Sequence, residues 1–282
     1  MVANMDTTGT MEVHNEIHKH SMLTMLHKYY SAKDIIESYK IYKTPEFLGS
    51  LGISTGIADR DIVKLTEIHS AGIKPTFINI DVANGYMETL IDYTKRIRTM
   101  FPNSILIAGN VVTGDRTREL IMEGGIDVVK VGIGPGAACL TRQKAGVGIP
   151  QLSAVAECAE AAHACGGYII ADGGITCPGD MAKAFCASAD FVMCGSVFAG
   201  HYENPGEMIE EGGRKYKMFY GMSSGHAMKK YAGKKAEYRS SEGRVIKIPL
   251  KGHLKDTIED YLGGVRSCCT YINAPTIADM PN

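Results

Sequence analysis

Residues 127–142 read Asp-Val-Val-Lys-Val-Gly-Ile-Gly-Pro-Gly-Ala-Ala-Cys-Leu-Thr-Arg, a short apolar run followed by a turn with three glycines and a proline. The run is typical of a buried strand, and the glycines allow the backbone that follows to approach a ligand closely. The turn ends at Cys139, and Thr141 follows two residues later. A cysteine placed in this way becomes a nucleophile when backbone N–H groups or a cation favour its thiolate. An isolated turn of this kind is more often a loop with a small buried cysteine. The rest of the chain therefore decides between a nucleophilic and a structural role for Cys139.

The same order of apolar run and polar turn recurs along the chain. Apolar runs alternate with amphipathic stretches about every 25 to 40 residues, which is typical of βα units around a parallel sheet. We predict strands at residues 2–5, 22–27, 47–53, 75–82, 104–112, 127–133, 168–171 and 191–194. We predict helices at residues 59–71, 87–100, 116–123, 152–165, 179–187 and 254–266. This order predicts an α/β fold of the (β/α)8 TIM-barrel class.

The region after the eighth predicted strand differs from the repeated units. Residues 200–248 predict an inserted flap that carries a β-ribbon made from residues 216–219 and 243–248. We expect the tail, residues 274–282, to be frayed. The first strand begins almost at residue 1, so we expect it to be shortened and the chain to be truncated at its N-terminus. All of this fits a single catalytic domain over residues 1–282.

Composition excludes several classes of function. The 282 residues are 45% hydrophobic and 22% charged with a formal net charge of −1, so no overall field attracts nucleic acid or an acidic membrane surface. No apolar run approaches the roughly 20 residues of a membrane span. The eight cysteines form no Cys-x-x-Cys pair, and several lie in apolar segments typical of reduced thiols. A cytoplasmic protein that acts on a small molecule fits best.

Small and polar residues follow the last two predicted strands. Asp172-Gly173-Gly174 and Gly195-Ser196 match the phosphate site that TIM barrels often build from these loops. The Asp172 carboxylate would repel phosphate but accepts hydrogen bonds well from ribose hydroxyls. The pattern therefore predicts a bound nucleoside monophosphate close to a reactive cysteine.

These motifs together resemble the IMP dehydrogenase/GMP reductase family over nearly the whole chain, from Val2 to about Tyr271. The stretches that carry the resemblance are Ala3-Asn-Met-Asp-Thr7, Asp81-Val-Ala-Asn-Gly-Tyr86, Ala108-Gly-Asn-Val-Val-Thr-Gly114, residues 130–142 and 146–155, Cys177-Pro-Gly-Asp-Met-Ala-Lys-Ala184, and Phe219-Tyr-Gly-Met-Ser-Ser224 with residues 227–233. The resemblance implies a TIM barrel, and its reductase branch implies NADPH-dependent reductive deamination of GMP to IMP and ammonia. It further implies a homotetramer and a bound monovalent cation, K⁺.

The resemblance also implies roles for individual residues. Cys139 would attack purine C2, Thr141 and Glu242 would move protons, and Lys28 would assist near the cofactor. The residues implied to contact GMP are Asp172, Gly173, Gly174, Gly195, Ser196, Gly221, Met222, Ser223, Arg239, Ser240, Ser241 and Gly243. Those implied to contact NADPH are Lys28, Asp81, Val82, Ala83, Ile133, Gly134, Tyr238, Arg239, Ser267, Cys268, Cys269 and Thr270. Those implied to hold K⁺ are Gly134, Gly136, Cys139 and Arg142.

Two alternatives stay open at the level of sequence. IMP dehydrogenase shares the barrel and the cysteine loop, but the segment from Asn84 to Cys139 leaves no room for the regulatory modules normally inserted in that enzyme. The second alternative is a nucleotide-binding relative that co-assembles with full-length subunits without turning over. At the phosphate site, Ala137 stands where the family usually has a serine, and Ser196 replaces a usual glycine on the adjacent loop.

Overall fold

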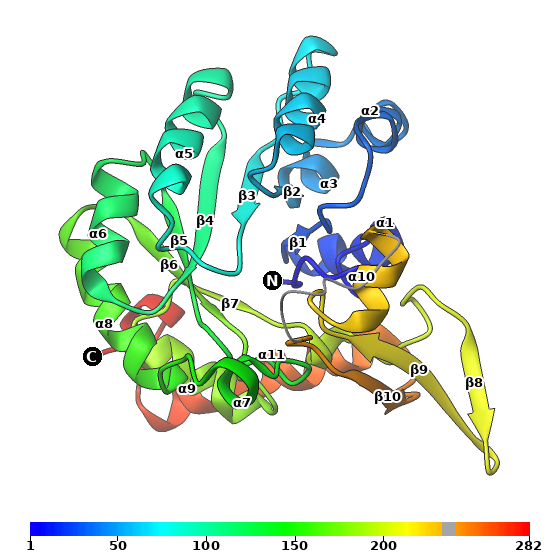
Figure 1. Cartoon of the computed structure of the whole chain (residues 1–282). Helices are drawn as coiled ribbons and strands as arrows, with labels where there is room; N and C mark the ends of the chain where they lie inside the picture. The colour runs from blue at the N-terminus through cyan, green and yellow to red at the C-terminus, as the bar shows by residue number, and fades with distance from the viewer. Residues whose placement is uncertain (233–240) are drawn as a thin grey trace.

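The computed structural model describes residues 1–232 and 241–282, and its centre is a curled parallel sheet (Figure 1). Seven strands follow one another in chain order, from β1 to β7, and each pairs in parallel with the next. The strands are β1 Thr24–Met25, β2 Leu51–Thr55, β3 Phe77–Asp81, β4 Ile105–Val111, β5 Val128–Val131, β6 Tyr168–Asp172 and β7 Phe191–Met193. This order of parallel strands confirms the predicted TIM-like α/β class.

Val2 joins the two edges of this sheet. It forms parallel bridges with Thr24 on one side and Cys194 on the other. Its N–H donates to Leu23 O at 2.8 Å, and the N–H of Ala3 donates to Cys194 O at 2.9 Å. The chain then turns away from the sheet, so the predicted strand at residues 2–5 is reduced to a bridge at one residue. That bridge is nevertheless enough to pair both edge strands, which would otherwise present unpaired backbone groups.

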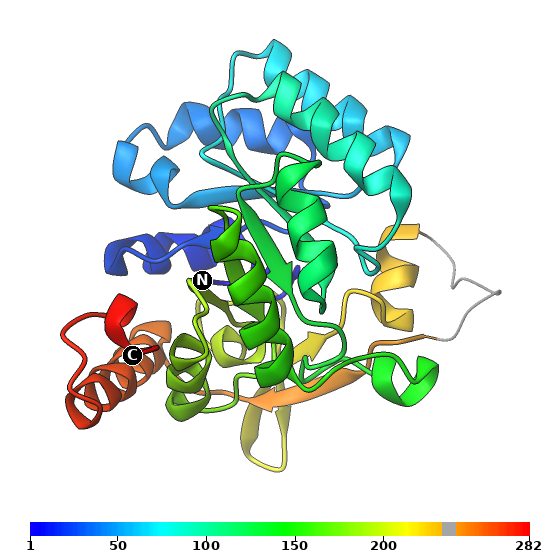
Figure 2. The same cartoon turned by 90° about the vertical axis from the view of Figure 1, so that its left-hand side faces the viewer.

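Helices cover the outer face of the sheet (Figure 2). They are α1 Met11–Ile17, α2 Ala32–Ile41, α3 Pro45–Gly49, α4 Asp59–Ser70, α5 Glu88–Met100, α6 Gly114–Met122, α8 Gln151–Ala164 and α9 Pro178–Cys186. The short helix α7 Thr141–Ala145 instead follows the cysteine loop and has no buried residue. In α4, for example, Ile62, Leu65 and Ile68 are buried at spacings of three residues, because that spacing repeats on one face of a helix. None of the helices in the described ranges is long and apolar enough to cross a bilayer.

One predicted strand is partly wrong. Residues 47–53 were expected to form one strand, but α3 occupies Pro45–Gly49 and the strand β2 starts only at Leu51. Pro45 at the first turn favours a helix start, and the helix buries Phe47 against Met11 and Leu26. An apolar run that contains both elements cannot be divided by hydrophobicity alone.

The flap contains the predicted ribbon and an additional strand and helix. Strand β9 Arg214–Tyr220 pairs antiparallel with β10 Val245–Pro249 on one side and with β8 Met208–Glu211 on the other. Helix α10 Gly225–Ala232 follows β9 and lies near β1 and the N-terminal segment (Figure 1). The ribbon therefore projects from the barrel, and α10 returns to it.

The C-terminal region is more ordered than its sequence predicts. Helix α11 Leu254–Tyr271 runs five residues beyond the predicted end at residue 266 and packs against α9. In the tail, the 3-10 helix η3 Ile277–Asp279 is capped by Thr276, and Met280 is buried. The tail thus folds back onto the core instead of fraying.

Candidate active site

A cavity of about 580 Å³ opens at the C-terminal ends of the barrel strands and beneath the flap. The residues predicted to carry chemistry or bind ligands converge on it. Those that line it are Lys28, Asp81, Val82, Ala83, Ile133, Gly134, Gly136, Cys139, Thr141, Asp172, Gly173, Gly174, Gly195, Ser196, Gly221, Met222, Ser223 and Glu242. This face is where TIM barrels carry their chemistry.

Cys139, Thr141 and Glu242 form a hydrogen-bonded chain at the cavity, which we call the relay. The Cys139 thiol donates to Thr141 Oγ1 at 3.2 Å, and the Thr141 hydroxyl donates to Glu242 Oε2 at 2.7 Å. All three residues are half-buried. A thiol, a hydroxyl and a carboxylate in sequence allow a proton to pass from sulfur toward the carboxylate.

Backbone contacts between the cysteine loop and the flap hold the relay together. Cys139 forms an antiparallel bridge with Gly243, and the N–H of Leu140 donates to Glu242 O at 2.7 Å. The Arg244 guanidinium donates from Nε and Nη2 to Ala137 O, at 2.9 and 2.7 Å. Glu242 therefore reaches Thr141 because hydrogen bonds join the cysteine loop to the flap at Glu242 and at the two residues that follow it.

Asp81, Asn110, Lys130 and Asp172 form a second polar group in the cavity, which we call the strand-end cluster. Lys130 Nζ lies 2.7 Å from Asp81 Oδ1 and 2.8 Å from Asp172 Oδ2, and it also donates to Asn110 Oδ1. Asn110 Nδ2 donates to Asp172 Oδ2 at 2.9 Å and to Gly132 O at 2.7 Å. These residues belong to four consecutive strands, β3 to β6, so the barrel itself sets their spacing.

The charges of the strand-end cluster stabilise one another. Burial works against the charged form of Lys130, yet Asp172 and Asp81 raise its pKa above the ordinary value. Burial alone would raise the pKa of Asp81, but Lys130, together with Lys28 and a hydrogen bond from Asn4, holds that pKa below its ordinary value. Lysine and aspartate are therefore both ionised at neutral pH.

The glycines of the strand-end loops are required by their backbone geometry. Gly173 and Gly174 have φ values of +89° and +81°, which side chains rarely adopt. A Cβ at Gly173 would lie 3.2 Å from Pro135 and 3.3 Å from Gly136 N. The two loops therefore pack backbone against backbone, and the N–H of Gly173 donates to Met193 O at 3.3 Å.

Comparison with known proteins agrees with this geometry. The sequence profile of the IMP dehydrogenase / GMP reductase domain matches residues 1–282. The chain belongs to the IMP dehydrogenase/GMP reductase family. GMP reductase 1 from Homo sapiens is 51% identical over 282 residues, which cover 99% of this chain and 80% of that protein. GMP reductase 2 from Bos taurus is 52% identical over 276 residues, which cover 97% of this chain and 78% of that protein. GMP reductase from Caenorhabditis elegans is 48% identical over 280 residues, which cover 99% of this chain and 78% of that protein.

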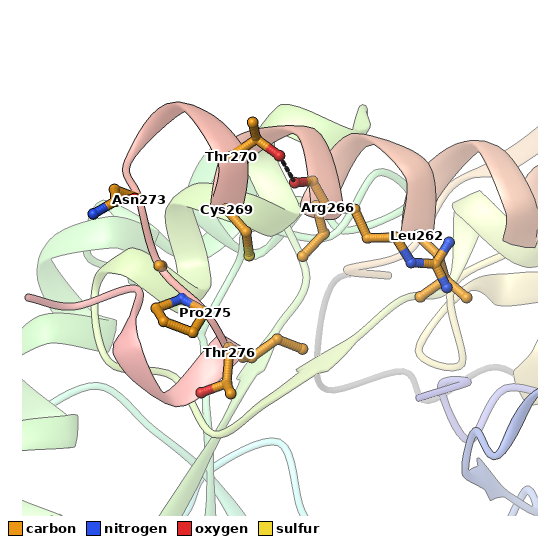
Figure 3. Close-up of a pocket in the computed structure, with 10 residues that line it drawn as sticks. Leu262, Arg266, Cys269, Thr270, Asn273, Pro275 and Thr276 are labelled. Carbon is orange, nitrogen blue, oxygen red and sulfur yellow. Dashed lines mark hydrogen bonds between the residues drawn. The ribbon is translucent and has the colours of Figure 1, made fainter.

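Some residues that the family resemblance implied as ligand contacts do not lie at the cavity. Ser267, Cys268, Cys269 and Thr270 are in α11, and both views place the end of this helix on the opposite side of the molecule from α10 (Figures 1 and 2). Figure 3 shows Cys269 and Thr270 lining a separate cavity of about 600 Å³ between α11 and the tail. Within one chain, this cavity is therefore separate from the cavity at the C-terminal ends of the barrel strands.

The remaining implied residues of the family pattern lie in the flap and the cysteine loop. Ser241 accepts from Gly225 N at 2.9 Å and donates to Ser223 O and Gly243 O, so it supports the flap loop. Arg142, in α7, donates to Ile149 O at 2.5 Å and packs beside Gly134. Tyr238, Arg239 and Ser240 lie outside the described residues.

Two features of this family member were not identified from its sequence. Lys130 was not assigned a role, although a lysine inside the apolar strand Val128–Val131 is a signal that a carboxylate lies nearby. The other feature is Asp6, which is buried and accepts hydrogen bonds at Oδ2 from Tyr220 and Tyr231 at 2.6 Å and from Lys230 at 2.8 Å. Asp6 thereby ties β9 and α10 to the N-terminal segment.

Proposed function

We propose that this protein catalyses the NADPH-dependent reductive deamination of GMP to IMP and ammonia. The observation that carries the proposal is the relay, in which Cys139, Thr141 and Glu242 are hydrogen-bonded at a glycine-lined cavity. The names of the relatives, which are GMP reductases at about half identity, point to the same reaction.

GMP would lie in the half of the cavity made by β6, β7 and the flap. Gly174 and Ser196 line this half, and their backbone N–H groups would bind the phosphate, while Asp172 suits the ribose hydroxyls. Gly221, Met222 and Ser223 would face the base. This placement brings purine C2 toward Cys139, which follows β5 between the two halves.

The relay would perform the covalent step. The Cys139 sulfur bonds to purine C2 while its proton moves through Thr141 to Glu242, and a returned proton lets the exocyclic amine leave as ammonia. Bound NADPH would supply the hydride that reduces C2, and Cys139 would then leave C2 as the thiolate when IMP is released. Division into two steps separates loss of a poor leaving group from reduction.

The cofactor residues suit the other half of the cavity. Lys28 at the end of β1, Asp81, Val82 and Ala83 at the end of β3, and Ile133 and Gly134 after β5 all line it. Gly134 has a φ of +87°, and a Cβ there would lie 2.6 Å from Arg142 Cγ, so glycine is needed at this position. These residues would orient the nicotinamide beside Cys139, with Lys28 near its charged groups.

A monovalent cation would be held by the cysteine loop in this proposal. No group of three or more His, Cys, Asp or Glu side chains in the described residues is arranged to hold a metal ion. Backbone carbonyls of Gly134, Gly136 and Cys139 instead offer the oxygen donors that K⁺ prefers. Arg142 would support this loop through its contact with Ile149, and the ion would fix loop shape.

In the homotetramer that we propose, the two separated sets of cofactor residues would come together from different subunits. If Lys28 and Asp81 contact the same dinucleotide as Cys269 and Thr270, the two sets come from neighbouring subunits, because one chain holds them in separate cavities.

All eight cysteines lie in the described residues and are free thiols, which favours the reducing cytosol.

The first test is NADPH absorbance after GMP and K⁺ are added to the purified protein, with Cys139→Ala as the control. We expect GMP-dependent oxidation, with IMP and ammonia formed in equal amounts, and a loss on the order of 10⁴-fold or more in the variant. Folded wild-type protein that binds GMP without turnover would favour a non-catalytic, co-assembling role. Formation of XMP from IMP and NAD⁺ would favour an IMP dehydrogenase.

A further inference from the structure

Lys130 lies between the residues proposed to hold GMP and those proposed to hold the cofactor. We propose that Lys130 is a positioning residue that couples the binding of GMP to the binding of NADPH, by holding the Asp172 and Asp81 carboxylates with one ammonium group. The inference rests on the proposed function, which assigns Asp172 to the ribose of GMP and Asp81 to the cofactor.

The hydrogen bonds of Lys130 show why it acts through other residues. An ammonium group has three donors and no acceptor. Nζ uses them on Asp81 Oδ1 at 2.7 Å, Asp172 Oδ2 at 2.8 Å and Asn110 Oδ1. No donor is left for a ligand, and the Lys130 side chain is only 3% exposed.

The carboxylates, in contrast, remain available to ligands. The side chains of Asp81 and Asp172 are 25% and 20% exposed, and both line the cavity. Lys130 and Asn110 both use Oδ2 of Asp172, so Oδ1 is left to accept from ribose hydroxyls. Each carboxylate therefore faces the buried ammonium with one oxygen and the cavity with the rest of the group.

This arrangement links the two halves of the cavity. Asp81 ends β3 and Asp172 ends β6, and Lys130 in β5 reaches both. Two carboxylates that share one cation cannot move independently, because displacing one changes the field and the hydrogen bond at the other. A ligand that fixes one carboxylate in place then prepares the other, which is a coupling free energy between two sites.

The test measures GMP binding by titration calorimetry with and without saturating NADP⁺, which cannot reduce GMP. In the wild type we expect NADP⁺ to tighten GMP binding by about 5-fold or more. Lys130→Met should abolish this effect and raise KM for both GMP and NADPH, whereas Lys130→Arg should restore it because its fork of donors can hold two carboxylates. The matched control is Lys217→Met, a buried lysine of the flap strand β9 that donates to the neutral carbonyl of Asn204 at 2.5 Å, and it should keep the coupling.

The outcomes separate this inference from the proposed function. Wild-type protein without GMP-dependent NADPH oxidation contradicts the function itself. Wild-type turnover without coupling, or coupling that persists in folded Lys130→Met, overturns only the role of Lys130. If Lys130→Met does not fold, the double variant Lys130→Met with Asp81→Asn, which keeps the net charge of the cluster, replaces it. If NADP⁺ still tightens GMP binding in that double variant, the inference is also overturned.

Discussion

The relay and the strand-end cluster share one cavity but are built in different ways. The relay joins Thr141 to Glu242 across 101 positions of sequence, and its residues lie on the cysteine loop, at the start of α7 and in the flap. Every member of the strand-end cluster lies in a barrel strand. The relay therefore depends on contacts between two peripheral segments, whereas the cluster depends on sheet pairing in the core.

This difference suggests a division of tasks within the proposed reaction. In the strand-end cluster one ammonium, that of Lys130, is shared by two carboxylates and holds both in place. The relay has one carboxylate and two neutral donors, so it is able to accept a proton at Glu242. A fixed group built on barrel strands suits ligand binding, and a relay that reaches the flap suits proton transfer.

The largest expected effect comes from breaking the relay. Glu242→Gln keeps the size of the side chain and an acceptor oxygen for Thr141 but removes the proton acceptor. We expect kcat to fall by about 10²- to 10⁴-fold while the Kd of GMP stays within about a factor of three. Steady-state kinetics and calorimetry check this, with Glu211→Gln on the exposed ribbon as the control. An unchanged kcat would remove Glu242 from the proposed mechanism.

The next effect is a loss of stability in acid, which should arise from histidines outside the relay and the strand-end cluster. Burial lowers the pKa of His14, His27 and His201 to about 4, from the ordinary 6.5. At a pH between about 4 and 6.5, these three imidazoles bind more protons in the unfolded chain than in the folded chain. The free energy of unfolding should therefore fall by a few kcal/mol from pH 7 to 5. The lowered pKa of Asp81 means that its own contribution is lost only at still lower pH.

Urea unfolding at pH 7, 6 and 5 measures this loss. In His14→Gln, the amide can still donate to Phe47 O, which His14 Nε2 contacts at 2.9 Å, so the slope of stability with pH should become smaller. His69→Gln, at an exposed position, should leave the slope unchanged. A stability that is flat over this pH range would contradict the assignment of neutral, buried imidazoles.

A smaller effect should distinguish the two groups directly. Asp6→Asn weakens the hydrogen bonds from Tyr220, Tyr231 and Lys230 that tie the flap to the N-terminal segment. We expect a loss of about 2 kcal/mol in the free energy of unfolding and faster hydrogen exchange in α10. Because the relay depends on the flap, kcat should fall more than the coupling between GMP and NADP⁺ changes. Equal losses in both would contradict the separation of the two groups.

The sequence predicted the parts of this molecule that depend on local pattern. Alternating apolar runs identified the strands, and the glycine-rich turn identified the loop that carries Cys139. The contact between Thr141 and Glu242 was inferred from resemblance alone, because nothing local relates residues so far apart. The role of Lys130 was missed because its partners lie on neighbouring strands, and α3 was missed because the helix and the strand β2 share one apolar run.

The smallest expected effect concerns Ser196, which with Ala137 lines the predicted phosphate site. Ser196 begins a 3-10 turn after Gly195, and its carbonyl accepts from Lys251 at 2.9 Å, so the backbone holds its position without the side chain. Ser196→Gly should therefore fold normally and lose the hydroxymethyl side chain, raising KM for GMP about 10-fold with kcat nearly unchanged. The double variant Ser196→Gly with Ala137→Ser should recover most of this loss if a hydroxyl from either loop serves the same phosphate. A single variant with an unchanged KM would show that backbone N–H groups alone bind the phosphate here.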